Sequence, residues 1–325
     1  MIRRLSVTAF VTVLLAAGPS ATATADTGPP RLDHPSSRRV TFALIGDTPY
    51  GDDQRAVFPA LVDAIDADPH VRFVLHAGDV KNGSSTCDDR RFADLAALYN
   101  TLDDPFVLTP GDNEWTDCHR TACGNYLPTE RLDAVRQFFY PTPGLTGGGN
   151  PMSVATQARN PEHAAYVENV RFDRSRVVFA TVHVVGSDND LAPWSELPGG
   201  DRPAERLAEF EARLAAALDW IDRTFDRAER LDADGVLLLM QAEPVESAGF
   251  TDIRRRIVER STAFGRPVLL VHGDEHVFEE EPGYAGVPNL TRLETFGDTA
   301  SHWLRVTVAP RHPEVFSWTP ETVGA

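Results

Sequence analysis

The 325-residue chain lacks an excess of positive charge. It contains 31 lysine and arginine residues against 48 aspartates and glutamates, so its formal net charge is -17, and Lys81 is its only lysine. An acidic surface of this kind repels phosphate backbones. We therefore expect no nucleic-acid partner bound through a basic patch, and we attribute the scarcity of lysine to biased codon usage.

Long apolar runs are also lacking outside the N-terminus. Two arginines at positions 3 and 4 precede an apolar stretch, residues 5–17, that is too short to span a bilayer comfortably, and Ala-Thr-Ala at residues 23–25 matches a signal-peptidase site. We expect residues 1–25 to be a cleaved secretory signal rather than an uncleaved membrane anchor. The mature protein is then secreted, without a membrane segment, and begins with a disordered linker at residues 26–39.

Cysteine is scarce, with only Cys87, Cys118 and Cys123 in the chain. Secreted proteins form disulfides because their compartment is oxidising, so we expect one disulfide and one remaining thiol. Cys87 and Cys118 follow two apolar runs at similar intervals and could pair across a cleft, and the close pair Cys118–Cys123 is the alternative. A zinc site is disfavoured, because no C-x-x-C spacing occurs.

The residues that are present show one recurring pattern, a short apolar run that ends in Gly-Asp. Runs of this kind indicate buried strands, and intervening amphipathic segments make the order β-α-β-α-β, which predicts a parallel sheet with crossover helices. Ligands of such sheets bind beyond the carboxyl ends of the strands. The four runs end at Asp47, Asp79, Asp112 and Asp274.

Periodicity predicts further elements in a single domain over residues 40–320. In the first helix we expect Val57, Leu61 and Ile65 on the buried face. Residues 141–161 lack a pattern and are expected to be a long loop. The other predicted elements are helices at 54–67, 89–102, 129–139, 202–230 and 251–264, a hairpin at 166–184, strands at 40–45, 71–76 and 236–240, a last parallel strand at 267–271, and antiparallel strands within 291–319.

The four aspartates and the nearby His276 predict a metal site. Carboxylates brought together repel one another unless a cation lies between them, and sites rich in oxygen prefer hard ions. Each aspartate alone could instead cap a helix N-terminus, which Asp does well. For the four together we favour the metal site.

The order of these motifs resembles the calcineurin-like metallophosphoesterases over nearly the whole mature chain. That family's motifs are Asp-x-His, Gly-Asp, Gly-Asn-His-(Asp/Glu), a lone His and Gly-His-x-His. The resemblance implies an α/β fold in which a two-sheet β-sandwich is flanked by helices. The matching stretches are Gly46-Asp47, Gly78-Asp79, Gly111-Asp112-Asn113-Glu114, Gln241 and Gly273-Asp274-Glu275-His276.

Several positions depart from the family's pattern. Pro49 stands where the first histidine belongs, and Asp112 and Asn113 replace the Asn-His pair. Gln241 replaces the lone histidine, and Asp274 replaces the first histidine of the last motif. Asp47, Asp79 and His276 keep the family's residues.

The resemblance implies two divalent metal ions. Because imidazole has largely been exchanged for oxygen, Mn, Mg or Ca is expected rather than Zn or Fe. One ion would be held by Asp47, Asp79 and His276, with Tyr50 as an accessory ligand, and the other by Asp79, Asp112, Gln241 and Asp274.

The resemblance also implies catalytic positions. Asn113 replaces the histidine that assists the leaving group, and an amide cannot donate a proton as an imidazolium does. His183, Glu114 or His119 could take that role, although each has an ordinary structural interpretation. Lys81 and Asn82 could contact a substrate oxyanion, although we expect both to be exposed loop residues.

These inferences predict a secreted metallophosphoesterase-type hydrolase. It would cleave a small-molecule phosphate monoester or diester through a hydroxide that bridges the metals. Loops at residues 145–161 and 188–202 would shape its pocket. The alternative is a catalytically impaired protein on the same fold that binds Ca or Mg, or another ligand.

Overall fold

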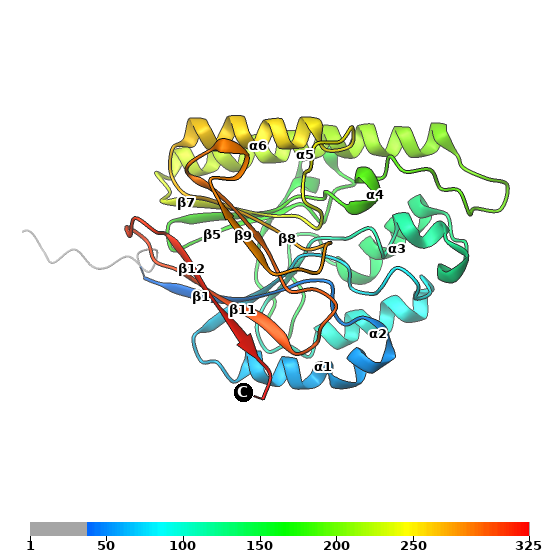
Figure 1. The fold of residues 1–325 in the computed structure, drawn as a ribbon, viewed down its shortest axis with the longest axis horizontal. Coiled ribbons are helices and arrows are strands. Elements are labelled where there is room, and N and C mark those ends of the chain that lie inside the picture. Colours follow the sequence, from blue (N-terminus) through cyan, green and yellow to red (C-terminus); the bar gives the residue numbers. More distant parts are fainter. Residues whose placement is uncertain (1–37, 325) are drawn as a thin grey trace, which may run out of the picture. The chain divides into compact units, whose positions relative to one another are not determined.

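The structure is a computed structural model that describes residues 38–324, all of which belong to one compact unit. Two mixed β-sheets pack face to face, and helices cover their outer faces (Figure 1). The expected two-sheet α/β sandwich in a single domain is confirmed. The predicted signal peptide, and the linker up to residue 37, lie outside the described residues.

The first sheet has five strands, of which the three at one edge are parallel. β1, β2 and β3 run in parallel as predicted, while β11 pairs with β1, and β12 with β11, in antiparallel register. The strand order is β12 (Phe316–Thr322), β11 (His302–Val308), β1 (Val40–Ile45), β2 (Val71–His76) and β3 (Phe106–Leu108).

The second sheet has seven strands. β6, β7, β8 and β10 run in parallel, and antiparallel strands complete both edges. The strand order is β4 (Ala155–Thr156), β5 (Val170–Arg174), β6 (Val177–Thr181), β7 (Gly235–Leu239), β8 (Val268–His272), β10 (Leu290–Glu294) and β9 (Glu279–Pro282).

Helices form the outer layers on both sides of the two sheets. One hydrophobic cluster joins the first sheet to α1, α2 and α3, and a second joins the other sheet to α5 and α6. Within residues 38–324, no helix combines the length and apolar character that crossing a membrane requires. The helices are α1 (Gly51–Asp66), α2 (Asp89–Tyr99), α3 (Pro128–Phe139), the short turn α4 (Gly186–Asn189), α5 (Pro203–Arg230) and α6 (Thr251–Phe264).

Two details of the prediction are wrong. Val57 is 55% exposed, because the face of α1 that packs inward is centred on Phe58, one position and about 100° further round the helix. The strand at 267–271 is not the last parallel strand, because β10 pairs with β8 in parallel register. The connection between them contains β9, whose sequence Glu-Glu-Glu-Pro lacks the apolar alternation typical of a strand.

Aromatic rings fill the space between the two sheets. Phe73 on β2 is fully buried, stacks on Phe42 with 5.0 Å between ring centroids, and meets Phe172 and Phe179 edge-on at 5.3 and 5.4 Å. The two edge-on contacts join strands of different sheets. The sandwich therefore fixes how the ends of the two sets of parallel strands face each other.

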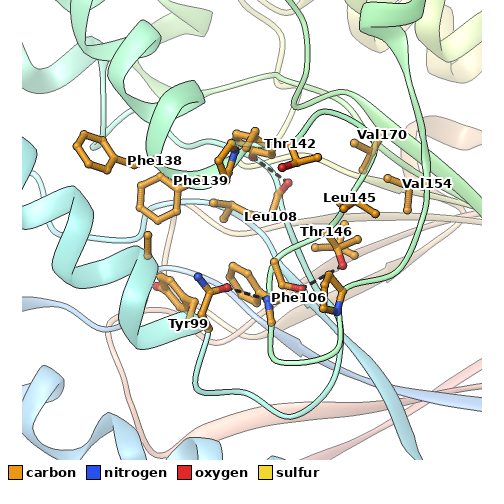
Figure 2. A pocket seen from close by; sticks show the side chains of 18 residues that line it. Tyr99, Phe106, Leu108, Phe138, Phe139, Thr142, Leu145, Thr146, Val154 and Val170 are labelled. Atoms are coloured by element: carbon orange, nitrogen blue, oxygen red, sulfur yellow. Dashed lines mark hydrogen bonds between the residues drawn. The ribbon is translucent and has the colours of Figure 1, made fainter.

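An apolar pocket of about 290 Å³ lies against β3 (Figure 2). Its walls come from the C-terminal ends of α2 and α3 and from residues 141–154, and they include the rings of Tyr99, Phe106, Phe138 and Phe139. None of the four strand-end aspartates lines this pocket. The loop at 145–161 thus contributes to a pocket away from those aspartates.

We predict that Phe73→Ala lowers the free energy of unfolding by about 3–5 kcal/mol, because it opens a cavity between the sheets. Urea unfolding followed by circular dichroism measures the change. Val57→Ala is the control, since its exposed side chain should change stability by no more than about 0.5 kcal/mol. Equal effects of the two substitutions would contradict the assignment of Phe73 to the inter-sheet core.

Candidate metal centre

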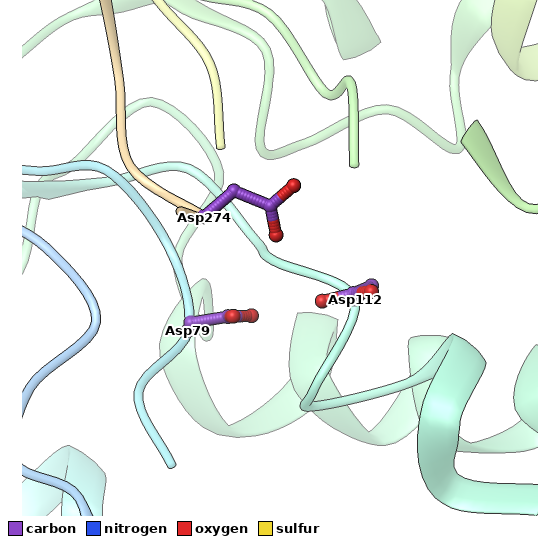
Figure 3. A group of neighbouring side chains, drawn as sticks. All are labelled: Asp79, Asp112 and Asp274. Atoms are coloured by element: carbon purple, nitrogen blue, oxygen red, sulfur yellow. The ribbon is translucent and has the colours of Figure 1, made fainter. Parts of the chain in front are cut away.

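The carboxyl ends of strands from both sheets meet at one place, and aspartates cluster there. Asp79 follows β2, Asp112 follows β3 and Asp274 follows β8, and one carboxylate oxygen of each lies within 4.8 Å of the others (Figure 3). Asp47, which follows β1, is joined to the group because it accepts a hydrogen bond from the backbone N–H of Asp274 at 3.1 Å. The sequence pattern thus predicted side chains that do come together.

These aspartates do not cap helices. The N-cap residue of α1 is Tyr50, without a side-chain bond, and that of α2 is Asp88, which accepts from Arg91. Asp47 and Asp79 therefore stand outside the positions that satisfy helix N-termini. The alternative that each aspartate serves as a cap is wrong for both.

Asp79 is the centre of the hydrogen-bond network. Its Oδ2 accepts from the Tyr50 hydroxyl at 3.0 Å, from Asn113 Nδ2 at 2.7 Å and from Gln241 Nε2 at 3.4 Å. Its Oδ1 accepts from the backbone N–H of Asn113 at 3.0 Å. Gln241 Nε2 also donates to Asp274 Oδ1 at 2.7 Å, so it links two of the clustered carboxylates.

Asp47 is fully buried but only partly satisfied. Its Oδ1 lies 3.4 Å from the Tyr50 hydroxyl and 3.6 Å from His276 Nε2, whereas its Oδ2 has no hydrogen-bond partner. A buried carboxylate oxygen without a donor is costly, and a bound cation would satisfy it. His276 and Tyr50 also contact each other, with their rings 5.2 Å apart.

The glycines of the Gly-Asp pattern make this crowding possible. A Cβ added to Gly111 would lie 2.0 Å from Asp79 Oδ1, and one added to Gly273 would lie 2.1 Å from Asp47 Oδ2. Each glycine therefore makes room for an aspartate from another strand. This close approach, rather than a turn alone, requires glycine at these two positions.

The electrostatics of the group favour a positive ion. Burial, and then repulsion by Asp112 and other carboxylates, raises the pKa of Asp79 well above its usual range. Burial, together with repulsion by Asp112 and Asp47, raises the pKa of Asp274 to about 8. The pKa of His276 is raised chiefly by its interaction with Asp47.

The residues present fit a hard divalent cation. The donor set is almost entirely carboxylate and amide oxygen, which Mg, Mn and Ca prefer, and the unpartnered Asp47 Oδ2 supplies a free ligand atom. Asp79, Asp112 and Asp274 are placed to hold one ion. The assignment of individual ligands to two separate ions remains a prediction.

The predicted catalytic pair Asn113 and Glu114 lies at the cluster in supporting roles. Asn113 Nδ2 donates to Asp79 and also lies 3.0 Å from the Tyr50 hydroxyl. The Glu114 carboxylate accepts from the backbone N–H groups of Gly111 at 2.7 Å and Val80 at 3.3 Å. Burial raises the pKa of Glu114 to about 7. Both side chains therefore hold the turn that carries Asp112.

His183 and His119 are held in other interactions. His183 is fully buried, its Nδ1 lies 2.9 Å from Glu168 Oε1, and its ring packs against Trp115. His119 Nδ1 accepts from the backbone N–H of Glu196 at 3.4 Å. Within residues 38–324 neither ring hydrogen-bonds the four aspartates, and their roles as proton donors remain predictions.

Lys81 is not an exposed loop residue, so that expectation is wrong. Only 1% of Lys81 is exposed, and its Nζ donates to the backbone oxygen of Asn82 at 3.1 Å. Burial lowers the pKa of Lys81. Asn82 is partly exposed, and its Oδ1 accepts from Ser84 and from Ser85 at 2.8 Å.

Two residues at the centre were not predicted. Ser187 Oγ lies 3.0 Å from both Asp112 Oδ2 and Asp117 Oδ1, and Asp117 is itself buried. A sequence pattern for Ser187 did exist, since the mostly apolar residues 177–185 are followed by Gly186 and polar residues, as at the other strand ends. A Cβ on Gly186 would lie 2.6 Å from Asp112 Oδ2, so this glycine follows the same rule of close approach.

Ser187 lies in an unusual backbone turn. Ser187, Asp188, Asn189 and Asp190 all have positive φ, between 53° and 65°, so α4 is a left-handed turn. Its side chains hold it in place, because Asp188 Oδ1 accepts from the backbone N–H of Gly249 and Asp190 Oδ1 accepts from the Trp194 indole. Backbone strain of this kind clusters at functional sites. Gly186 and Ser187, which directly precede the predicted pocket-shaping segment 188–202, thus border the centre.

A disulfide supports the turn after β3. Cys87 and Cys118 are bonded, and Cys123 is a buried free cysteine, so the first of the two pairings considered is the one present. Both sulfurs of the disulfide lie 3.7 Å from the backbone oxygen of Asn113. The disulfide therefore ties the loop after β2 to the loop after β3, directly behind the carboxylates.

This fold and site define a class of protein: a two-sheet α/β sandwich with a cluster of aspartates, able to hold a metal ion, at its strand ends. The sequence profile of the calcineurin-like phosphoesterases matches residues 40–278. The chain therefore belongs to the calcineurin-like phosphoesterase family, as its motifs indicated.

Solved structures that are similar to this chain include two that align over most of their length. No curated protein matches the chain by sequence. The GAP50 anchor in the inner membrane complex of Plasmodium aligns over 88% of this chain and 90% of its own, with 11% identity and a TM-score of 0.46. The calcineurin-like phosphoesterase YfkN from Bacillus subtilis aligns over 88% of this chain and 91% of its own, with the same identity and TM-score.

We predict that the metal-free protein loses stability as the pH rises from about 4 to about 8. In the folded chain Asp274 keeps its proton up to about pH 8, whereas its ordinary pKa is 3.8, so the folded state binds more protons in this window and the free energy of unfolding falls. Cations compete with these protons. Mn²⁺ should therefore raise the melting temperature more at pH 8 than at pH 5.

Thermal unfolding in EDTA and in Mn²⁺ at both pH values tests this expectation. The variant Asp252→Asn, which changes a half-exposed carboxylate on α6, is the control and should behave as the unmodified protein does. Equal stabilisation by Mn²⁺ at the two pH values would contradict the assignment of these carboxylates as metal ligands.

Proposed function

We propose that this protein is a secreted, metal-dependent phosphoesterase that hydrolyses a small-molecule phosphate ester. The observation that carries the proposal is the cluster Asp79, Asp112 and Asp274, in which one carboxylate oxygen of each lies within 4.8 Å of the others, in a member of the calcineurin-like phosphoesterase family. Secretion is supported by the sequence of residues 1–25 and by the Cys87–Cys118 disulfide, since disulfides persist in oxidising compartments.

We propose that two divalent ions are bound, with Asp79 shared between them. Asp47 and His276 would complete one site, while Asp112, Gln241 and Asp274 would complete the other. When bound, the ions would activate water as the nucleophile and neutralise charge on the phosphoryl oxygens. Mn, Mg or Ca suits this set of ligands better than Zn or Fe.

The hydrogen bonds around Asp79 supply orientation. Tyr50, Asn113 and Gln241 all donate to Asp79 Oδ2, so they fix the orientation of the Asp79 carboxylate. Asn113 has no proton to give to a leaving group at neutral pH, and its amide is already engaged with Asp79. We therefore propose that the enzyme favours esters whose leaving group needs no protonation, such as aryl phosphates.

We predict that the purified protein with Mn²⁺ or Mg²⁺ hydrolyses p-nitrophenyl phosphate or its bis-aryl diester, and that Asp79→Asn reduces kcat by more than about a hundredfold. Substituting a residue that only contacts a metal ligand lowers activity by up to about a hundredfold, so substituting a direct ligand should lower it further. Release of p-nitrophenol measures the rate. Asp252→Asn, on the exposed side of α6, is the matched control and should keep full activity.

Metal content measured by mass spectrometry separates this proposal from its alternative. Activity retained by Asp79→Asn would overturn the assignment of the site. Bound Ca²⁺ without turnover of either ester would instead support a metal-binding protein that has lost catalysis, an alternative favoured by the engagement of Asn113 with Asp79.

A further inference from the structure

One positive side chain borders the acidic centre and remains open to solvent. Arg120 follows the short 3₁₀ turn Thr116–His119, and its side chain is 40% exposed. Its Nη1 lies 2.6 Å from Asp117 Oδ2, and the other oxygen of Asp117 lies 3.0 Å from Ser187 Oγ. Ser187 in turn lies 3.0 Å from Asp112, so a continuous chain of contacts joins Arg120 to the metal centre.

A second observation places the guanidinium beside Asn113. A Cβ built on Gly83 would lie 2.9 Å from Arg120 Nη1 and 2.7 Å from Asn113 Oδ1, so both groups converge on the same glycine. Asn113 Nδ2 donates to Asp79 at 2.7 Å. Arg120 therefore lies next to the residue that stands where the family has its leaving-group histidine.

The other cations near the centre are already engaged. Lys81 is buried and donates to a backbone oxygen, and His276 pairs with Asp47. Within residues 38–324, Arg120 has Asp117 as its single acidic partner, which leaves the rest of its N–H groups without a protein acceptor. A guanidinium carries five donors in a planar fork, so one carboxylate contact does not saturate it.

We propose that Arg120 binds a non-bridging oxygen of the substrate and selects phosphate monoesters over diesters. This inference rests on the proposed function. A monoester has three non-bridging oxygens and more negative charge, whereas a diester has two, so an additional cationic donor beside the centre benefits the monoester. Asp117 positions the guanidinium, and charge-assisted bonds from arginine to phosphate are strong and directional.

The test compares Arg120→Gln and Arg120→Lys with the unmodified protein. Mature protein loaded with Mn²⁺ is assayed on p-nitrophenyl phosphate and on bis(p-nitrophenyl) phosphate, and binding of inorganic phosphate is measured by calorimetry. Arg120→Gln should raise the monoester KM and the phosphate Kd by about tenfold to a hundredfold. It should leave the diester KM unchanged, and Arg120→Lys should recover part of the loss because it keeps the charge without the fork.

A matched control removes an arginine of the same kind elsewhere. Arg255 on α6 is also exposed and pairs with an acidic residue three positions away, Asp252, at 2.8 Å. Arg255→Gln should leave KM, kcat and phosphate binding as they are. Equal metal content and melting temperature in Arg120→Gln separate a loss of substrate binding from a loss of structure, and Arg120→Lys decides the question if the glutamine variant unfolds.

The outcomes distinguish this inference from the proposed function. If the unmodified protein hydrolyses the monoester and Arg120→Gln keeps its KM and phosphate affinity, the role of Arg120 is wrong and the function stands. If phosphate binds in a manner that depends on Arg120 but neither ester is cleaved, the proposed function is wrong and the role of Arg120 in phosphate binding stands. If phosphate does not bind and neither ester is cleaved, both are wrong.

Discussion

The mutual repulsion of buried carboxylates is the constraint on which this centre depends. Asp47 and Asp79 are almost fully inaccessible to water, and burial raises the pKa of both. Such groups would move apart if they stood on flexible loops. Asp47 and Asp79 stay together because they follow neighbouring strands of one sheet, and Asp274 is held beside them because the aromatic contacts of Phe73 join that sheet to the other. The rigid sandwich thus keeps the carboxylates close together, and a bound cation would reduce the repulsion between them.

Bringing the strand ends this close leaves almost no room for side chains between them. Gly111, Gly186 and Gly273 each lie where an added methyl group would overlap a carboxylate of another segment. In the Gly-Asp pairs at Gly111 and Gly273, the aspartate supplies charge and the glycine admits the charge of a neighbour. Gly46 and Gly78 instead make room for uncharged groups, so a single Gly-Asp would carry little information about function.

The sequence could predict the residues that a local pattern marks, but not those that tertiary contacts place. Asp47, Asp79, Asp112 and Asp274 were found because a local pattern, an apolar run followed by Gly-Asp, marks each of them. The parallel pairing of β10 was missed because its partner is chosen by tertiary contacts and the intervening β9 has no apolar residue except its proline. The burial of Lys81 depends on which loops meet, and no local pattern records that. Ser187 follows a mostly apolar run and a glycine, as the aspartates do, but a serine at that place carries no charge that would mark it as a ligand. The sequence was therefore informative about ligands and much less so about the residues that surround them.

Replacing histidines by residues with oxygen ligands removes groups that could donate a proton, and it leaves a site whose main property is negative charge. Tyr50 and Asn113 lie near the positions from which the family's histidines have gone, and both use their polar groups on Asp79. They orient a ligand and offer little to a leaving group. His276 is an imidazole that remains at these aspartates, and it pairs with Asp47 at 3.6 Å. Under the proposed function, discrimination between substrates would come from leaving-group chemistry and from positive charge at the rim of the site. In the role proposed for Arg120, that charge lies where the disulfide-tethered loop after β3 meets Ser187, so this loop, rather than the metal ligands, would set specificity.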